Sequence, residues 1–182
     1  SGEGNSKLDL ELPAVQYKLL DEVLKVNKNT AVLLFSGRPL AIKRLSETAP
    51  AILEVWQPGT EGGSAAANLL FGKAVPSGKL TMSFPAKTGQ CPIYYNHYNT
   101  GRPRRNDDVR VAYTSSYIDG PNKPLYPFGY GLSYTSFGYS CLKLSADVLE
   151  SGGSLTASVK VKNEGAVAGE ETVQLYIRDL YG

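Results

Sequence analysis

Apolar residues recur at close to helical spacing early in the chain and then gather in a short unbroken run. The helical pattern opens at Pro13, continues to Val26 and is ended by Asn27–Asn29. This pattern predicts an amphipathic helix. The run Ala31–Phe35 follows and is closed by turn residues, starting with Ser36. A continuous apolar run between turn residues is typical of a buried parallel strand.

The same order is repeated in the next stretch. Pro39–Glu47 has helical character, Ala51–Trp56 is a second apolar run, and a further helix is expected from Gly62 or Ser64 to Phe71. Helices alternating with buried strands indicate βαβ units. We therefore expect an α/β fold, a sandwich of helices around a mostly parallel sheet with flavodoxin-like layers.

The pattern changes after the third helix. Residues 79–84 alternate as a strand would, whereas residues 93–138 are rich in Tyr, Asn, Gly, Pro and Arg and show little periodicity. An irregular stretch of this length usually has a function or forms an interface. We interpret its end, Tyr126–Tyr134, as a structural strap toward a following domain.

Alternation of apolar and polar residues returns near the end. It runs from Leu155 to Val161, turns at Asn163–Gly165 and resumes from Val173 to Ile177. This pattern is typical of an antiparallel β-sandwich, which when complete has about seven strands. Only about three strands are visible, so we expect a partial sandwich in a fragment of a longer protein. The predicted domains are residues 1–138 and residues 139–182.

Composition excludes several classes of function. The chain has 182 residues, 42% hydrophobic and 20% charged, with a net charge of +2. This balance argues against binding to nucleic acid or to a membrane surface, and no apolar run is long enough to span a bilayer. Cys91 and Cys141 lack the paired spacing of a zinc site; they could form a disulfide, although two isolated cysteines are more often buried thiols. We predict no metal and no cofactor.

Four stretches, in this order, resemble glycoside hydrolase family 3. They contain, in turn, the motifs Ser1-Gly2-Glu3 with Leu12-Pro13 and Gln16; Ser36-Gly37-Arg38-Pro39-Leu40; Trp56-Gln57-Pro58-Gly59-Thr60-Glu61-Gly62-Gly63 with Pro76-Ser77-Gly78-Lys79-Leu80; and Asn96-His97-Tyr98-Asn99-Thr100-Gly101-Arg102-Pro103 with Tyr126-Pro127-Phe128-Gly129-Tyr130-Gly131. The stretch from Val161 to Tyr176 is similar to the start of the fibronectin type III-like domain found in many members. The resemblance thus covers almost the whole chain.

The resemblance implies a retaining hydrolase of β-linked glucosides or xylosides, β-glucosidase-like and periplasmic or secreted. Such an enzyme needs a nucleophile and a general acid/base about 5–5.5 Å apart. In this family the nucleophile is an Asp on an upstream barrel domain, and the acid/base is the Glu that Glu3 matches. The family usually has Arg where this chain has Lys7, which keeps the charge but loses the bidentate fork. This segment alone is expected to be inactive.

Three other residues are candidates for the site. Glu61 precedes a predicted helix and is a second choice for a carboxylate near the substrate. Trp56 ends a predicted strand, where a core or domain-interface aromatic and a sugar-stacking platform are both possible. His97 is the only histidine, in a polar loop without a nucleophile-elbow motif, and we interpret it as a hydrogen-bonded loop residue.

Two other classes of function stay open. The chain could be a non-catalytic carbohydrate-binding or structural module that keeps the fold. It could also be a nucleotide-binding α/β domain, since Pro58–Gly63 joins a strand to a helix and helix N-termini favour anions. That loop lacks both the G-x-G-x-x-G pattern and a P-loop lysine, so the nucleotide hypothesis ranks last.

Overall fold

The computed structural model describes residues 4–98, 100–104 and 111–179. These residues form two compact units. The first contains the chain up to Ala66, Lys79–Tyr130 and the segment from Leu175. The second contains Ala67–Gly78 and Gly131–Gln174.

The first unit opens with α1 (Ala14–Val26), where the sequence predicted it. The helix begins directly after Pro13, whose fixed φ suits a helix start, and ends where Asn27 turns to an extended conformation. Only Tyr17 and Leu20 of this helix are buried. Val15, which belongs to the same apolar pattern, is exposed.

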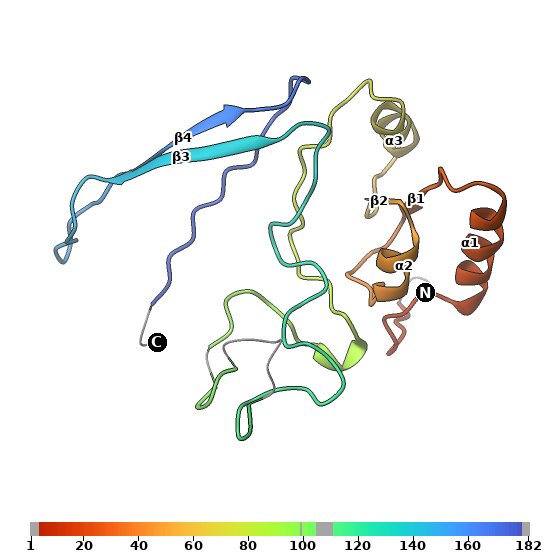
Figure 1. Ribbon diagram of the computed structural model, residues 1–182, viewed down its shortest axis with the longest axis horizontal. Helices are drawn as coiled ribbons and strands as arrows, with labels where there is room; N and C mark the ends of the chain where they lie inside the picture. Colours follow the sequence, from red (N-terminus) through yellow and green to blue (C-terminus); the bar gives the residue numbers. More distant parts are fainter. Residues whose placement is uncertain (1–3, 99, 105–110, 180–182) are drawn as a thin grey trace. The chain divides into compact units, whose positions relative to one another are not determined.

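A parallel pair of strands follows. β1 (Ala31–Leu34) and β2 (Ala51–Glu54) pair with Ala31 opposite Ala51, and α2 (Lys43–Thr48) connects them. Figure 1 shows α1 and α2 beside this pair. A two-stranded sheet has little stability of its own, so it depends on the side chains packed against it. The predicted α/β class is confirmed here.

Three predicted boundaries are wrong by a few residues. The second helix begins at Lys43 rather than Pro39, because Ala41 donates its backbone N–H to the Leu10 carbonyl at 3.0 Å and its segment is tied to the N-terminal loop. β2 ends before Trp56, whose φ of 52° does not fit a strand. Phe35 lies beyond β1 and is 60% exposed.

The core of the first unit gathers side chains from separated segments. It is formed by Tyr17, Leu20, Leu34, Ile42, Leu45 and Phe84. Phe84 is 1% exposed. Its ring lies 5.7 Å from that of Trp56 and 6.4 Å from that of Tyr126, centroid to centroid.

The predicted strand over residues 79–84 is wrong. The backbone pairs only near its two ends, where Leu80 accepts an N–H from Gly129 at 2.7 Å and Phe84 donates to the Tyr126 carbonyl at 2.8 Å. A single bridge, Phe84 with Tyr126, results in place of a continuous ladder. The segment around Tyr126–Tyr130 is thus bonded to residues 80–84 within its own unit.

The second unit contains an antiparallel pair, β3 (Phe137–Leu144) and β4 (Ala157–Asn163), with Phe137 opposite Asn163. Figure 1 shows the two strands side by side. The register shifts between Ser140 and Lys143, and Cys141 at this irregularity has a φ of 56°. An antiparallel pair after an α/β unit agrees with the predicted partial sandwich.

Asn163 organises the turn after β4. Its side-chain oxygen accepts hydrogen bonds from the Thr135 hydroxyl at 2.6 Å and the Gly165 N–H at 3.0 Å, and its amide donates to the Val167 carbonyl at 2.9 Å. The predicted turn is therefore confirmed. The predicted last strand is wrong: the described residues 173–177 have no regular strand structure, because alternation of apolar and polar residues does not by itself specify a neighbouring strand.

Phe84→Ala tests the core. Removing a fully buried phenyl ring costs about 3–5 kcal/mol of the free energy of unfolding, because both transfer energy and contacts are lost. We expect denaturant unfolding of the protein to show a decrease of this size. Phe71→Ala is the matched control, since Phe71 is 80% exposed, and a surface change costs less than about 0.5 kcal/mol. Equal losses in the two variants would contradict the core assignment.

Candidate functional site

The polar groups of interest lie at the carboxyl edge of the β1–β2 pair. In open α/β sheets, ligands bind outside this edge. Ser36 follows β1, and Glu54 is the last residue of β2. The Ser36 hydroxyl donates to Glu54 Oε1 at 3.1 Å, and the backbone N–H of Trp56 donates to the same oxygen at 2.9 Å. One carboxyl group therefore connects the ends of both strands.

The other carboxyl oxygen of Glu54 is in an unusual position. Oε2 is buried and has no hydrogen-bond partner among the described residues. Burial raises the pKa of Glu54 above its ordinary value, although the hydrogen bonds from Trp56 and Ser36 act in the opposite direction. Burial therefore makes ionisation of Glu54 less favourable than that of an exposed glutamate.

The structure places the Trp56 ring against Phe84 in the first unit's core. The side chain is partly buried, and the backbone conformation is left-handed with φ 52°. The hydrogen bond to Glu54 stabilises this strained backbone. A sugar-stacking role for the part that stays accessible remains a prediction.

Glu61 lies in the turn between β2 and α3 (Gly62–Leu70), as the sequence predicted. The turn is closed by an N–H bond from Gly62 to the Gly59 carbonyl at 3.2 Å, and Gly59 has a positive φ of 72° that favours glycine. Glu61 itself is exposed. Its role toward a substrate remains a prediction.

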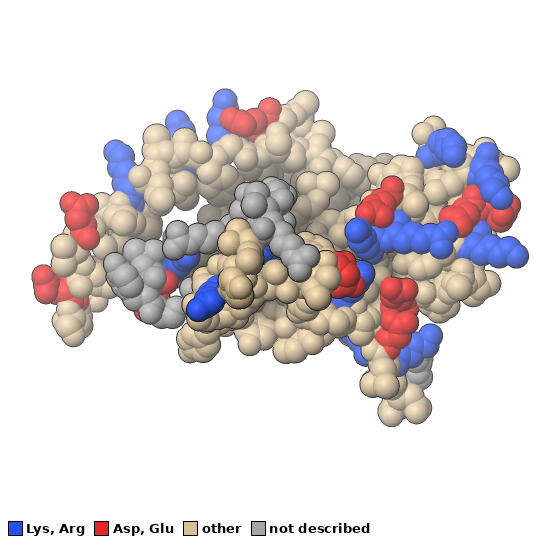
Figure 2. Space-filling view, turned by 60° about the horizontal axis from the view of Figure 1, so that its bottom comes forward, with Lys and Arg blue, Asp and Glu red and all other residues tan. Residues whose placement is uncertain are grey.

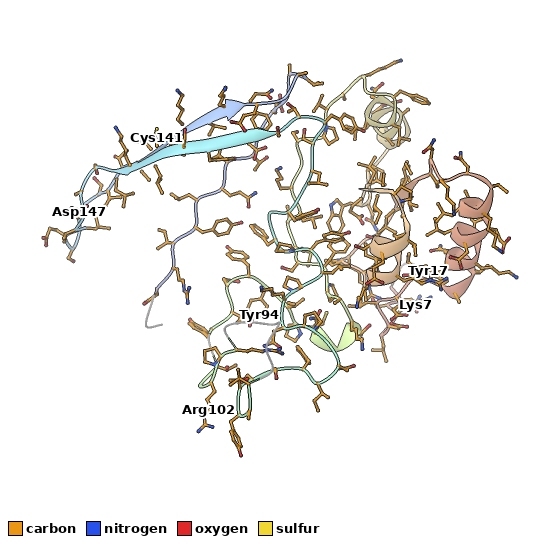
Figure 3. The ribbon with its side chains drawn as sticks, in the orientation of Figure 1. Lys7, Tyr17, Tyr94, Arg102, Cys141 and Asp147 are labelled. Atoms are coloured by element: carbon orange, nitrogen blue, oxygen red, sulfur yellow. The ribbon has the colours of Figure 1, made fainter. Side chains whose placement is uncertain are left out.

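Glu3, the predicted acid/base, lies outside the described residues. The chain just after it is held by other segments. Arg38 Nη2 donates to the Lys7 carbonyl at 2.6 Å, and Figure 3 labels Lys7. Leu10 donates its N–H to Thr88 Oγ1 at 3.2 Å. The N-terminal loop therefore rests on the first unit at several points.

Two of these residues were not among the sequence candidates. Glu54 ends an apolar run, and a carboxyl group at the end of a buried strand is a signal that could have identified it. Arg38 is part of the Ser36–Leu40 motif after β1, but its contact with Lys7 joins residues 31 positions apart. No periodicity indicates such a contact.

The other reactive side chains considered in the sequence are one histidine and two cysteines. His97 Nδ1 is hydrogen-bonded to the Tyr98 carbonyl at 3.0 Å, which confirms the predicted loop histidine. Cys91 and Cys141 are exposed and not joined in a disulfide; Figure 3 labels Cys141 on β3.

The described residues contain no group of three or more His, Cys, Asp or Glu side chains that could hold a metal ion. In the same part of the chain, no helix has the length and apolarity to cross a membrane. Basic and acidic side chains are interspersed on the face in Figure 2, in keeping with the small net charge of +2.

Sequence comparison decides the family. The model of the glycosyl hydrolase family 3 C-terminal domain matches residues 1–134. The chain belongs to glycoside hydrolase family 3. It is 46% identical to the periplasmic beta-glucosidase of Salmonella typhimurium over 98% of its length, and 43% identical to a beta-xylosidase of Formosa agariphila over 99%. It spans 23% and 24% of these two relatives.

Solved structures of the family agree. A mutant beta-glucosidase from Listeria innocua in complex with laminaribiose matches with a TM-score of 0.85 and 47% identity. The match covers 93% of this chain and 23% of that one. A beta-glucosidase from Erythrobacter marinus matches with a TM-score of 0.78 and 40% identity, over 91% of this chain and 20% of that one. The family resemblance and the fold class are therefore confirmed.

Glu54→Gln tests the raised pKa of Glu54. A raised pKa means that the folded state binds the proton more tightly than the unfolded chain. The stabilisation is present at low pH and is lost as pH rises through the folded-state pKa. Glutamine does not titrate, so the thermal stability of the variant relative to the parent protein should rise from about pH 4 to about pH 8.

Thermal unfolding of both proteins at the two pH values measures the difference in stability between variant and parent. A destabilisation by the new amide that does not depend on pH cancels when the two differences are compared. Glu47→Gln is the control, because the Glu47 side chain is 62% exposed and should show no such trend. A difference for Glu54→Gln that stays flat or falls with pH would contradict the assignment.

Proposed function

We propose that this chain is a segment of a retaining β-glycosidase that hydrolyses terminal β-linked sugars, β-glucosidase-like or β-xylosidase-like. The observation that carries the proposal is 46% identity to a beta-glucosidase over 98% of the chain. Since the chain spans about a quarter of such relatives, the activity belongs to a longer protein. A structural relative bound to laminaribiose supports a β-glucoside as the substrate class.

Glu3 supplies the general acid/base in this proposal. It matches the family's SGE motif, and the loop after it is held against the first unit through Lys7 and Leu10. A carboxyl group in this role first protonates the leaving oxygen and then removes a proton from water. Its nucleophilic partner is an Asp on an upstream barrel domain, about 5–5.5 Å away when the two domains meet.

Trp56 and Glu61 are the proposed substrate contacts. Both belong to the β2–α3 loop at the carboxyl edge of the sheet. The flat face of an indole stacks on sugar rings, and a carboxylate accepts hydrogen bonds from sugar hydroxyls. No cofactor enters the chemistry, because a two-carboxylate mechanism needs none.

The rest of the proposal concerns the parent protein. Residues 139–182 begin a fibronectin type III-like domain, and residues 1–138 form the α/β domain that works with the upstream barrel. The location is periplasmic or secreted, which a periplasmic relative supports.

Glu3→Ala in the full-length protein tests the acid/base. Loss of general acid catalysis should lower kcat/KM for a β-linked disaccharide about 10²–10⁴-fold. A dinitrophenyl β-glucoside has a leaving group that needs no proton, so its kcat/KM should change much less. The slow second step should then be accelerated by added azide, detected as glycosyl azide. Glu47→Ala is the control, and an equal effect of Glu3→Ala on both substrates would exclude Glu3.

The 182 residues alone should not hydrolyse either substrate, because the nucleophile is on another domain. Circular dichroism of the purified segment establishes that it is folded, and a sensitive fluorogenic β-glucoside assay measures turnover. Turnover within about 10-fold of that of the full-length protein would overturn the division of the two carboxylates between domains.

A further inference from the structure

The loop that follows Glu3 has little regular structure of its own, so its position depends on outside contacts. Its contacts with other segments include the hydrogen bonds from Arg38 to the Lys7 carbonyl, from Ala41 to the Leu10 carbonyl, from Leu10 to Thr88 Oγ1 and from Thr88 to the Asp9 carboxylate. Of these, the bond from Arg38 is the nearest to Glu3 along the chain. It is also a side-chain contact, so it can be removed by substitution.

The bond from Arg38 has the features of a strong anchor. Its length is 2.6 Å, and the donor is a charged guanidinium. Charge-assisted hydrogen bonds are about twice as strong as neutral ones. The acceptor is a backbone carbonyl, so the bond fixes the peptide of Lys7 whatever the Lys7 side chain does.

The backbone that carries Arg38 is itself held in place. Ser36 is bonded to Glu54 at the end of β2. At Gly37, a Cβ would lie only 3.0 Å from Gln57 Nε2, so the β1–α2 loop packs closely on the loop after β2. Arg38 therefore projects from a segment fixed by both strands rather than from a free loop.

We infer that Arg38 is a positioning residue for the general acid/base: its hydrogen bond to the Lys7 carbonyl fixes the segment that follows Glu3. The inference rests on the proposed function, because it gives Arg38 a role only if Glu3 is the proton donor. Misplacement of a catalytic group by about 1 Å is enough to cost up to about 10²-fold in rate. Such a loss falls on the step that needs the proton.

Arg38→Met in the full-length protein tests the inference. Methionine keeps an unbranched apolar stem and removes every donor. We expect kcat/KM for a β-linked disaccharide to fall at least about 10-fold, and that for a dinitrophenyl β-glucoside to fall less than about 3-fold. Arg38→Lys retains one charged donor and should recover most of the disaccharide activity.

Arg44→Ala is the matched control. Arg44 is another arginine of the first unit, and its hydrogen bond, to Asp21 at 2.6 Å, has the same length as that of Arg38. It contacts α1 rather than the N-terminal loop. The ratio of the two kcat/KM values should therefore be unchanged in this variant, even if its melting temperature falls.

Two results would overturn the inference. In one, Arg38→Met lowers kcat/KM equally for both substrates and Arg38→Lys does the same. That outcome indicates a role in stability alone. In the other, neither variant changes kcat/KM for either substrate. Glu3→Ala, measured alongside, separates the proposed function from the role of Arg38. If Glu3→Ala lowers kcat/KM more for the disaccharide than for the dinitrophenyl glucoside and Arg38→Met does not, only the role of Arg38 fails. If Glu3→Ala is not selective, the proposed function fails and the role of Arg38 fails with it.

Discussion

The core of the first unit depends on the packing of the Phe84 ring. This ring is 1% exposed, packs against Trp56 and Tyr126, and belongs to a residue whose backbone pairs with the segment at Tyr126. Side chains from α1, β1 and α2 meet at the same core. A two-stranded parallel sheet cannot bury enough apolar surface alone. The irregular segment that contains Phe84 therefore completes the core.

The carboxyl edge of the sheet is held together by the side chain of Glu54. Glu54 accepts hydrogen bonds from Ser36 and Trp56 on one oxygen while its other oxygen is buried without a partner. A carboxyl group in this environment is stable when protonated and costs free energy when ionised. The two loops that leave this edge lead to Arg38 and to Glu61. The hydrogen bonds that Glu54 accepts from Ser36 and Trp56 therefore tie together the starts of the two loops that the proposed chemistry uses.

In the proposed function the two catalytic carboxylates lie on different domains, so this segment holds one of them. The described residues supply a sheet edge, an anchored N-terminal loop and an antiparallel pair. The family's chemistry needs two carboxyl groups at short distance, and one of them is proposed to come from a domain outside this chain. In this proposal the α/β unit supports the segment that follows the proton donor, through the hydrogen bond from Arg38 to the Lys7 carbonyl.

The sequence by itself determined the order of α1, β1, α2, β2 and α3, the turn at Asn163 and the family, because periodicity, turn residues and motifs are local properties. It failed for residues 79–84 and for Val173–Ile177, where alternation is present but a continuous ladder needs a neighbour that local sequence does not specify. It also missed Glu54 and Arg38. Only the tertiary structure buries one oxygen of Glu54 and brings Arg38 to Lys7, because burial and long-range hydrogen bonds arise from segments that meet after folding.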